Sequence, residues 1–211
     1  MPLAYYSKAA TAEFWSEHWG EHSVEELLQV ARTSPLTEII EHHLPSGGWL
    51  LEAGCGLGQY VLLLRERGHA AVGVDWSFEA VSQGVQAGAP LAVMDLRGLG
   101  VRDQSVSAYI SLGVVEHEPE GPGGIVAEAA RVLTTDGVLL LSVPYWNGVR
   151  RLFAPYIIWQ NRRTHFAGGE FYQFAFTRRE VEAFLEAHGF TVRSFHPYGP
   201  ARILQKALKN F

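Results

Sequence analysis

Short apolar runs alternate with amphipathic segments through the middle of the chain. The apolar runs of strand length are residues 49–53, 70–74, 91–94, 106–112 and 137–143. Between them, apolar residues recur at close to helical spacing in residues 59–67, 78–87 and 125–133. Strands that alternate with helices in this way are typical of βα units. The pattern predicts an α/β fold with a doubly wound, mostly parallel, Rossmann-like sheet over residues 47–144.

The segments that precede and follow this core are predicted to cover it. Residues 11–19 and 24–43 have helical patterns, and Ser23 is placed to cap the second helix. We therefore expect an N-terminal helical cover over residues 1–46. Residues 145–176 are dense in aromatic side chains and are interrupted by proline and glycine, which favours a mobile lid insertion over the strand ends.

The C-terminal part, residues 177–211, predicts a helix, a strand and a tail. Thr177 and Glu180 fit a capping box that begins the helix, and residues 190–196 follow it as a strand. Residues 201–211 are helix-like, so a seventh strand of the sheet is not evident. We expect a single domain over all 211 residues. The missing seventh strand would mean that the sheet is shortened, that the substrate region is unusual, or that the chain is a truncated form of a longer protein.

Composition narrows the classes of function. The chain has 211 residues, 47% of them hydrophobic, which is enough for one sizeable core. Its formal net charge is −5 and its basic residues are scattered, so a nucleic-acid partner is not expected. Cys55 is the only cysteine, which excludes an internal disulfide and favours a reducing cytoplasm. No stretch is apolar over the roughly 20 residues that a membrane span needs.

The residues that predict chemistry begin at the end of the first core strand. Gly54, Gly56 and Gly58 alternate in a loop between a strand and a helix, and glycine allows a backbone to turn sharply and approach a ligand closely. Asp75 ends the next strand about 20 residues later, where the ribose diol of an adenosine would lie. The dinucleotide-binding pattern requires a third glycine at the position of Gln59, which disfavours a nicotinamide cofactor.

These residues resemble the first two motifs of the class I S-adenosylmethionine-dependent methyltransferases. The resemblance continues through residues 93–96, 109–117 and 128–142. The second of these segments is similar to that of the branch that includes the ubiquinone- and menaquinone-biosynthesis methyltransferases. Thr135-Asp136 stands where Pro-Gly is usual in the family. The resemblance implies an enzyme that binds S-adenosylmethionine and releases S-adenosylhomocysteine.

The resemblance also implies a role for each residue of the cofactor site. The loop glycines and Cys55 would hold the methionine part, and Glu52 would bind its ammonium group. Asp75 would accept both ribose hydroxyls, and Trp76 would pack on adenine. The alternatives are that Trp76 is a core aromatic residue and that Asp95 only caps the turn that follows it. The other implied residues are Asp95 at the adenine amine, Leu96 through its backbone, and Leu112 and Gly113 at the sulfonium end.

Two aromatic groups are candidates for binding the methyl acceptor. Tyr145, Trp146 and Tyr172 belong to the lid segment, whose aromatic density suits an apolar or aromatic small molecule. Tyr5 and Tyr6 belong to an N-terminal group that would fold over the cofactor. Arginines within the lid segment could meet a carboxylate, a phosphate or a membrane surface. A satellite core of aromatic residues with solvated arginines is the alternative.

His117 is the candidate catalytic residue. It follows the fourth strand, where the resemblance implies acceptor-facing residues, and histidine can take a proton near neutral pH. Glu116 could fix its tautomer. Alternatively, His117 only supports the loop before Pro119, because methyl transfer is an in-line displacement that proximity alone can promote. No metal is expected, since the sequence has no helix-spaced histidine pair and no cysteine cluster.

Three functions therefore stay open. The first is methyl transfer to a small-molecule acceptor by a monomer or homodimer, with oxygen, nitrogen or carbon as the methylated atom. The second is an NAD(P)-dependent oxidoreductase. The third is a non-catalytic, methyltransferase-like subunit that binds the cofactor.

Overall fold

The computed structural model describes residues 2–198, so the predicted helix at residues 201–211 lies outside the described residues. Within these residues, no helix is both long enough and apolar enough to cross a membrane. The strands are β1 Leu3–Ser7, β2 Trp49–Ala53, β3 Ala70–Asp75, β4 Leu91–Val93, β5 Val106–Leu112, β6 Leu133–Ser142 and β7 Glu170–Ala175. The helices are α1 Ala12–Gly20, α2 Val24–Thr33, α3 Pro35–His43, α4 Gln59–Glu66, α5 Phe78–Gln86, α6 Gly123–Val132, α7 Gly148–Leu152, α8 Ala154–Phe166 and α9 Arg178–Glu186, with a short 3-10 helix, η1, at Val115–His117.

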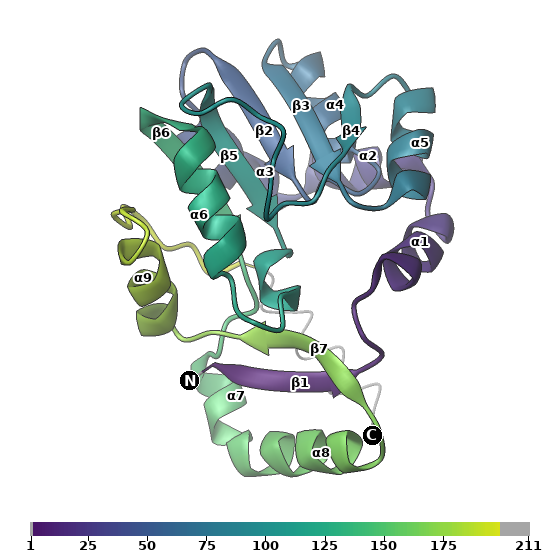
Figure 1. The fold of residues 1–211 in the computed structure, drawn as a ribbon, viewed down its shortest axis with the longest axis vertical. Helices are drawn as coiled ribbons and strands as arrows, with labels where there is room; N and C mark the ends of the chain where they lie inside the picture. The colour runs from purple at the N-terminus through teal and green to yellow at the C-terminus, as the bar shows by residue number, and fades with distance from the viewer. Residues whose placement is uncertain (1, 199–211) are drawn as a thin grey trace.

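Five of the strands form one parallel sheet in the order β4-β3-β2-β5-β6 (Figure 1). Within this sheet, the first strand along the chain is the central one, β2. The next two, β3 and β4, lie on one side of it, and the chain then crosses to the other side for β5 and β6. The order of the strands therefore reverses between β2 and β5, and open α/β sheets bind ligands at such a point. The predicted parallel α/β core is confirmed.

Alternating side chains of the central strand enter two different cores. Leu50 packs with residues of α2, α3 and α4 on one face of the sheet, and Leu51 packs with residues of α6 on the other. Successive side chains of a strand point to opposite faces, so a strand that is apolar throughout is buried on both. This two-sided burial explains why the core strands are apolar runs rather than alternating ones.

A second, two-stranded antiparallel sheet lies below the carboxyl ends of the main sheet, with α7 and α8 beneath it (Figure 1). In it β1 pairs with β7, so that Leu3 lies opposite Ala175 and Ser7 opposite Glu170. Neither strand was predicted, and the proposed lid segment is in fact α7, α8 and β7. Pairing between the two ends of a chain leaves no local pattern by which a sequence can reveal it.

Two further predictions of secondary structure were wrong. The single helix expected over residues 24–43 is two helices, because Pro35 lacks an amide hydrogen and begins α3, while Ser34 ends α2 and caps α3. Residues 190–196 form no strand. Phe190 and Val192 do pack inward against the core, as alternate residues of a strand would, but burial of alternate residues does not require backbone pairing.

The capping predictions, in contrast, are confirmed. Ser23 and Glu26 form a reciprocal capping box at the start of α2, and Thr177 and Glu180 form another at the start of α9. Both boxes satisfy amide groups that would otherwise have no partner in the first turn.

Gly84 gives a test of how closely α5 packs on the glycine loop. A Cβ at this position would lie 2.4 Å from Leu91 Cδ1 and 2.6 Å from the carbonyl oxygen of Leu57. We expect Gly84→Ala to lower the free energy of unfolding by about 1–3 kcal/mol in urea titrations, although alanine favours helix. Gly124→Ala in α6 is the control, because its Cβ would have only ordinary contacts. Equal or higher stability of Gly84→Ala would contradict the packing.

Candidate active site

The glycine loop between β2 and α4 is held against the end of β3. The amides of Gly54 and Cys55 donate to the carbonyl oxygen of Val74 at 2.8 and 3.1 Å. Gly54, Gly56 and Gly58 have φ angles of 78°, 53° and 75°, a region in which a residue with a Cβ is strained. The loop therefore needs glycine at all three positions, as the sequence predicted.

Asp75, the last residue of β3, connects this loop to the next. Its Oδ2 accepts a hydrogen bond from the Gly56 amide at 2.8 Å, and its Oδ1 accepts one from the Ser77 amide at 2.9 Å. Burial raises the pKa of the Asp75 carboxyl, and the amide hydrogen bonds oppose that rise. Each carboxylate oxygen has a further lone pair, so Asp75 can still accept hydrogen bonds from a ligand.

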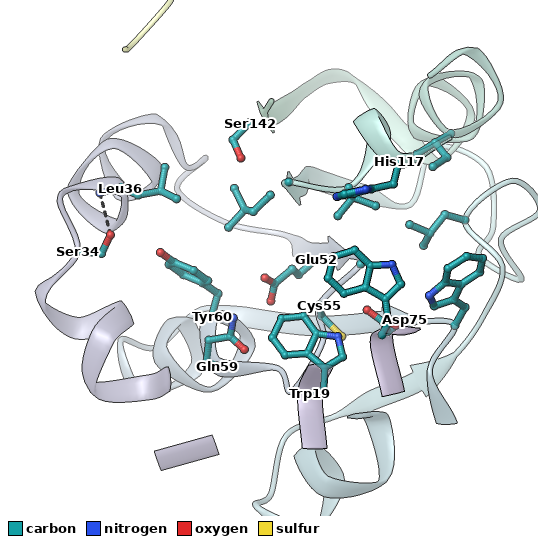
Figure 2. Close-up of a pocket in the computed structure, with 18 of the residues that line it drawn as sticks. Trp19, Ser34, Leu36, Glu52, Cys55, Gln59, Tyr60, Asp75, His117 and Ser142 are labelled. Atoms are coloured by element: carbon teal, nitrogen blue, oxygen red, sulfur yellow. Dashed lines mark hydrogen bonds between the residues drawn. The ribbon is translucent and has the colours of Figure 1, made fainter. Parts of the chain in front are cut away.

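A cavity of about 580 Å³ lies at the carboxyl ends of β2, β3 and β5, beside the reversal in strand order. Figure 2 shows Glu52 near its centre, Asp75 and Trp19 to one side, and Tyr60 and Ser34 to the other. A volume of this size is ordinary for a small-molecule site, for which about 300–1,000 Å³ is typical. Both its size and its place in the fold favour a ligand site.

The structure brings the predicted cofactor residues together around this cavity. Those on its wall are Glu52, Gly54, Cys55, Asp75, Trp76, Asp95, Leu96, Leu112 and Gly113. Gly56 and Gly58 lie just behind the wall, where Gly56 donates to Asp75 and Gly58 precedes α4. Trp76 is 40% exposed, so it is not the core aromatic residue of the alternative interpretation. What these residues bind stays a prediction at this point.

Glu52 is a buried carboxyl with an unused oxygen. Its Oε2 has no hydrogen-bond partner within the described part of the chain. Loss of solvation raises the pKa of Glu52 to about 8, and the neighbouring Asp75 contributes to the rise. A buried polar atom without a partner is costly, so its presence beside the glycine loop points to a ligand group that donates hydrogen bonds there.

The charged groups of the wall are nearly all acidic. The described part of the wall carries the carboxyls of Glu52, Asp75, Asp95 and Glu118 and contains no lysine or arginine. Asp95 also caps the following turn, because its Oδ1 accepts from the Arg97 amide at 2.9 Å. Its pairing with the Arg97 guanidinium lowers the pKa of Asp95. Among residues 2–198, no three histidine, cysteine, aspartate or glutamate side chains are placed to hold a metal ion.

His117 lies on the cavity wall and is held from outside by β7. Its Nδ1 is 2.7 Å from the carbonyl oxygen of Tyr172, which can only accept, so Nδ1 carries the hydrogen and donates it. Nε2 is then the free acceptor of the neutral ring. Burial lowers the pKa of His117, and the Tyr172 carbonyl opposes this. The partner that fixes the tautomer is therefore a backbone carbonyl and not Glu116, contrary to the expectation from the sequence.

None of the five predicted acceptor residues belongs to the described wall of the cavity. Tyr5 and Tyr6 lie on β1, Tyr172 lies on β7, and Tyr145 and Trp146 precede α7. Their ring contacts are with other aromatic side chains, such as Tyr172 with His117 at 5.0 Å between centroids. Direct contact of these residues with an acceptor stays a prediction.

Trp15 and Trp19 belong to the N-terminal aromatic group that was expected over the cofactor, and both lie on the wall. They are four residues apart on one face of α1, and a Cβ on Gly56 would come within 2.6 Å of the Trp19 ring. Other wall residues escaped the sequence reasoning. Tyr60 lies in the first turn of α4, where its helical spacing predicted only core packing. Ser34 and Leu36 lie on the wall, at the point where α2 ends and α3 begins. The dipeptide Ser34-Pro35 was a signal that could have revealed this break.

Residues 51–141 of the chain match a family model described as a methyltransferase domain. A malonyl-[acyl-carrier protein] O-methyltransferase from Hamiltonella defensa subsp. Acyrthosiphon pisum (strain 5AT) is 27% identical over 106 residues, which are 49% of this chain and 41% of that protein. The match thus spans less than half the length of that relative.

Two solved structures show the same fold. One is an S-adenosylmethionine-dependent methyltransferase from Thermotoga maritima, described as a possible histamine N-methyltransferase, with a TM-score of 0.62 and 18% identity over 86% of this chain and 82% of that one. The other is geranyl diphosphate C-methyltransferase from Streptomyces coelicolor A3(2), in complex with Mg²⁺, geranyl diphosphate and S-adenosylhomocysteine. Its TM-score is 0.60, with 17% identity over 74% of this chain and 61% of that one.

Glu116 in η1 provides a pH-dependent test of the buried charge near the site. Its Oε2 is buried without a partner in the described structure, and burial raises the pKa of Glu116 to about 8. Because the folded pKa exceeds the ordinary value of 4.5, the stability that this group contributes is present below about pH 4.5 and lost as the pH rises through about 8. We expect Glu116→Gln to gain at least about 1 kcal/mol over the parent protein between pH 5 and pH 8 in urea titrations.

Because the difference in unfolding free energy between variant and parent is compared at pH 5 and pH 8, any effect of the glutamine side chain that does not depend on pH cancels. Glu120→Gln, at an exposed neighbouring position, is the matched control and should show no such difference. A variant whose stability relative to the parent is the same at both pH values would refute the burial of a titrating Glu116.

Proposed function

Since residues 51–141 of this chain form a class I, S-adenosylmethionine-dependent methyltransferase domain, we propose that the protein transfers a methyl group from S-adenosylmethionine to a small, uncharged, aromatic or apolar acceptor. The observation that carries this proposal is the unpartnered Glu52 oxygen, which faces the same cavity as Asp75 and the glycine loop. The bound cofactor supplies an electrophilic methyl group on a cationic sulfur. The rest of the chemistry is positioning by the protein.

Each part of the cavity fits one part of this cofactor. The Glu52 carboxyl would receive the ammonium group, and in doing so it would become ionised and gain the partner that its Oε2 lacks. Asp75 would accept the two ribose hydroxyls, while Trp76, half-exposed at the rim, would pack against adenine. Leu112 and Gly113 would line the region of the reacting methyl group.

The charge of the wall supports an uncharged acceptor. With Glu52, Asp75 and Asp95 given to the cofactor, the described wall leaves an acceptor the carboxyl of Glu118 and no lysine or arginine that could pair with a diphosphate or carboxylate. The Trp15 and Trp19 rings offer flat apolar surface on the same wall. An aromatic or otherwise apolar molecule would therefore bind at the lowest cost in desolvated charge.

His117 would act on the acceptor as a general base or as an orienting hydrogen-bond acceptor. Its Nδ1 hydrogen is held by Tyr172, so the lone pair of Nε2 is available. Burial lowers the pKa of His117 below 6.5, so that the ring is neutral at pH 7. Through Tyr172, the β1–β7 sheet fixes the orientation of this ring, and it would help exclude water during transfer.

Replacement of Asp75 tests where the ribose binds. We expect Asp75→Ala to weaken S-adenosylmethionine binding by roughly 1.5–3 kcal/mol in calorimetry, because two hydroxyls lose a charged acceptor. The exposed Asp136→Ala is the control. No detectable binding by the folded parent protein at millimolar cofactor would end the methyltransferase proposal, and unchanged affinity of Asp75→Ala would mean that the ribose lies elsewhere.

A His117→Gln variant tests the proposed base. A screen of candidate acceptors with labelled cofactor first identifies one that turns over. With it, we expect His117→Gln to bind the cofactor normally and to transfer methyl at least about tenfold more slowly. Protonation of His117 should lower the activity of the parent protein at a pH below 6.5, and this loss should be absent from the variant.

His188 is a matched control, because its Nδ1 also lies 2.7 Å from a backbone carbonyl oxygen but away from the cavity. Unchanged turnover of His117→Gln would show that proximity alone carries the reaction. Cofactor binding without turnover of any acceptor would instead favour a non-catalytic, cofactor-binding subunit.

A further inference from the structure

Helices α7 and α8 form the end of the molecule that lies farthest from the main sheet (Figure 1). The inner side of α8 rests on β1, with Ile157, Asn161 and Thr164 half-buried against it. No residue of α8 is fully buried. The outer side of this helix pair is covered by nothing in the described structure.

The exposed surface of this helix pair carries large apolar side chains. Leu152 is 77% exposed, Phe153 56%, Trp159 55% and Phe166 85%. Trp159 and Phe166 are seven residues apart, which places them on the same face of α8. Single exposed apolar residues are common, but several gathered at one protruding end indicate a surface that is covered by something else.

The charge of this end is uniformly positive. Between Asp136 and Glu170 the sequence contains no acidic residue, although the whole chain has a net charge of −5. Arg151, Arg162 and Arg163 are exposed, and none of them has a carboxylate partner within residues 2–198.

The cations and the aromatic rings share one face. Arg162 and Arg163 follow Trp159 by three and four residues, so they lie beside it on the helix surface. The Arg163 guanidinium lies 5.7 Å from the centroid of the Trp159 ring. The exposed surface of the two helices thus combines large apolar side chains with arginines.

We propose that the outer face of α7 and α8 binds the headgroup region of an anionic lipid bilayer. The side chains of Leu152, Phe153, Trp159 and Phe166 enter the boundary between headgroups and acyl chains, while the arginines meet lipid phosphates. Tryptophan favours that boundary because its ring is apolar and its N–H is polar. The attachment is peripheral, since no described helix can span a bilayer.

A lipid surface fits these observations better than a protein partner does. The end is a protruding pair of helices in Figure 1. Its exposed Trp159 ring, with the Arg163 guanidinium over it, is the combination of groups that the interface of an anionic bilayer favours. The docking is independent of the proposed reaction, because it concerns binding alone. If it occurs, the β1–β7 cover of the cavity lies next to the bilayer, because α8 rests on β1.

The test is co-sedimentation of the full chain with vesicles. We expect binding to mixed phosphatidylglycerol–phosphatidylcholine vesicles, little binding to phosphatidylcholine alone, and release by salt. The double variant Arg162→Glu/Arg163→Glu should lower the partition coefficient about tenfold or more. Arg102→Glu/Arg193→Glu changes the net charge equally at exposed positions elsewhere and should bind like the parent protein.

The apolar contribution is tested separately. Trp159→Ala/Phe166→Ala should bind vesicles at least about tenfold more weakly, whereas Phe78→Ala, which removes an exposed ring from α5, should not. Thermal unfolding of each variant checks that it is folded. Absence of vesicle binding by the parent protein would overturn the proposal, as would equal loss in the two arginine pairs. Self-association that the Trp159/Phe166 variant abolishes, without vesicle binding, would assign the face to a second copy of the chain instead.

Discussion

The carboxylate of Asp75 is the interaction on which the geometry of the cavity depends. One oxygen holds the amide of Gly56 in the loop after β2, and the other holds the amide of Ser77 at the start of α5. These two loops come from neighbouring strands, and the hydrogen bonds of Asp75 add to those that the Gly54 and Cys55 amides make with the Val74 carbonyl. Both loops contribute to the cavity wall, the first through Gly54 and Cys55 and the second through Trp76. The same group is therefore both part of the scaffold and the candidate ligand-binding residue.

Two buried carboxyl groups near the site lower the stability of the fold. Glu52 and Glu116 are both buried with an oxygen that has no partner in the described structure, and burial raises the pKa of each to about 8. Only Glu52 faces the cavity, so only Glu52 can regain a partner from a bound cation. A ligand that provides this partner would stabilise the fold as well as fill the site. Glu116 has no such compensation from the cavity.

The sequence predicted the parts of the fold whose causes are local or periodic. The strands of the parallel sheet follow from apolar runs, the loop from its three glycines, and the caps from Ser23 and Thr177. Most of the residues expected to bind the cofactor lie on one cavity wall because they occupy neighbouring strand ends, and their role stays a prediction. Other features depend on contacts that no local pattern encodes. The Tyr172 carbonyl can reach His117 only because β7 pairs with β1, and Trp19 reaches the glycine loop only because α1 folds back over it.

The pairing of β1 with β7 also has a consequence for the order of folding. Leu3 lies opposite Ala175, so this sheet joins segments from nearly opposite ends of the described chain. Contacts of such high sequence separation are costly in loop entropy and form slowly, whereas the βα units of the core depend on nearer neighbours. During synthesis, the parallel sheet can assemble before β7 leaves the ribosome. The tautomer of His117 would then be fixed in a late step, after the cofactor cavity already exists.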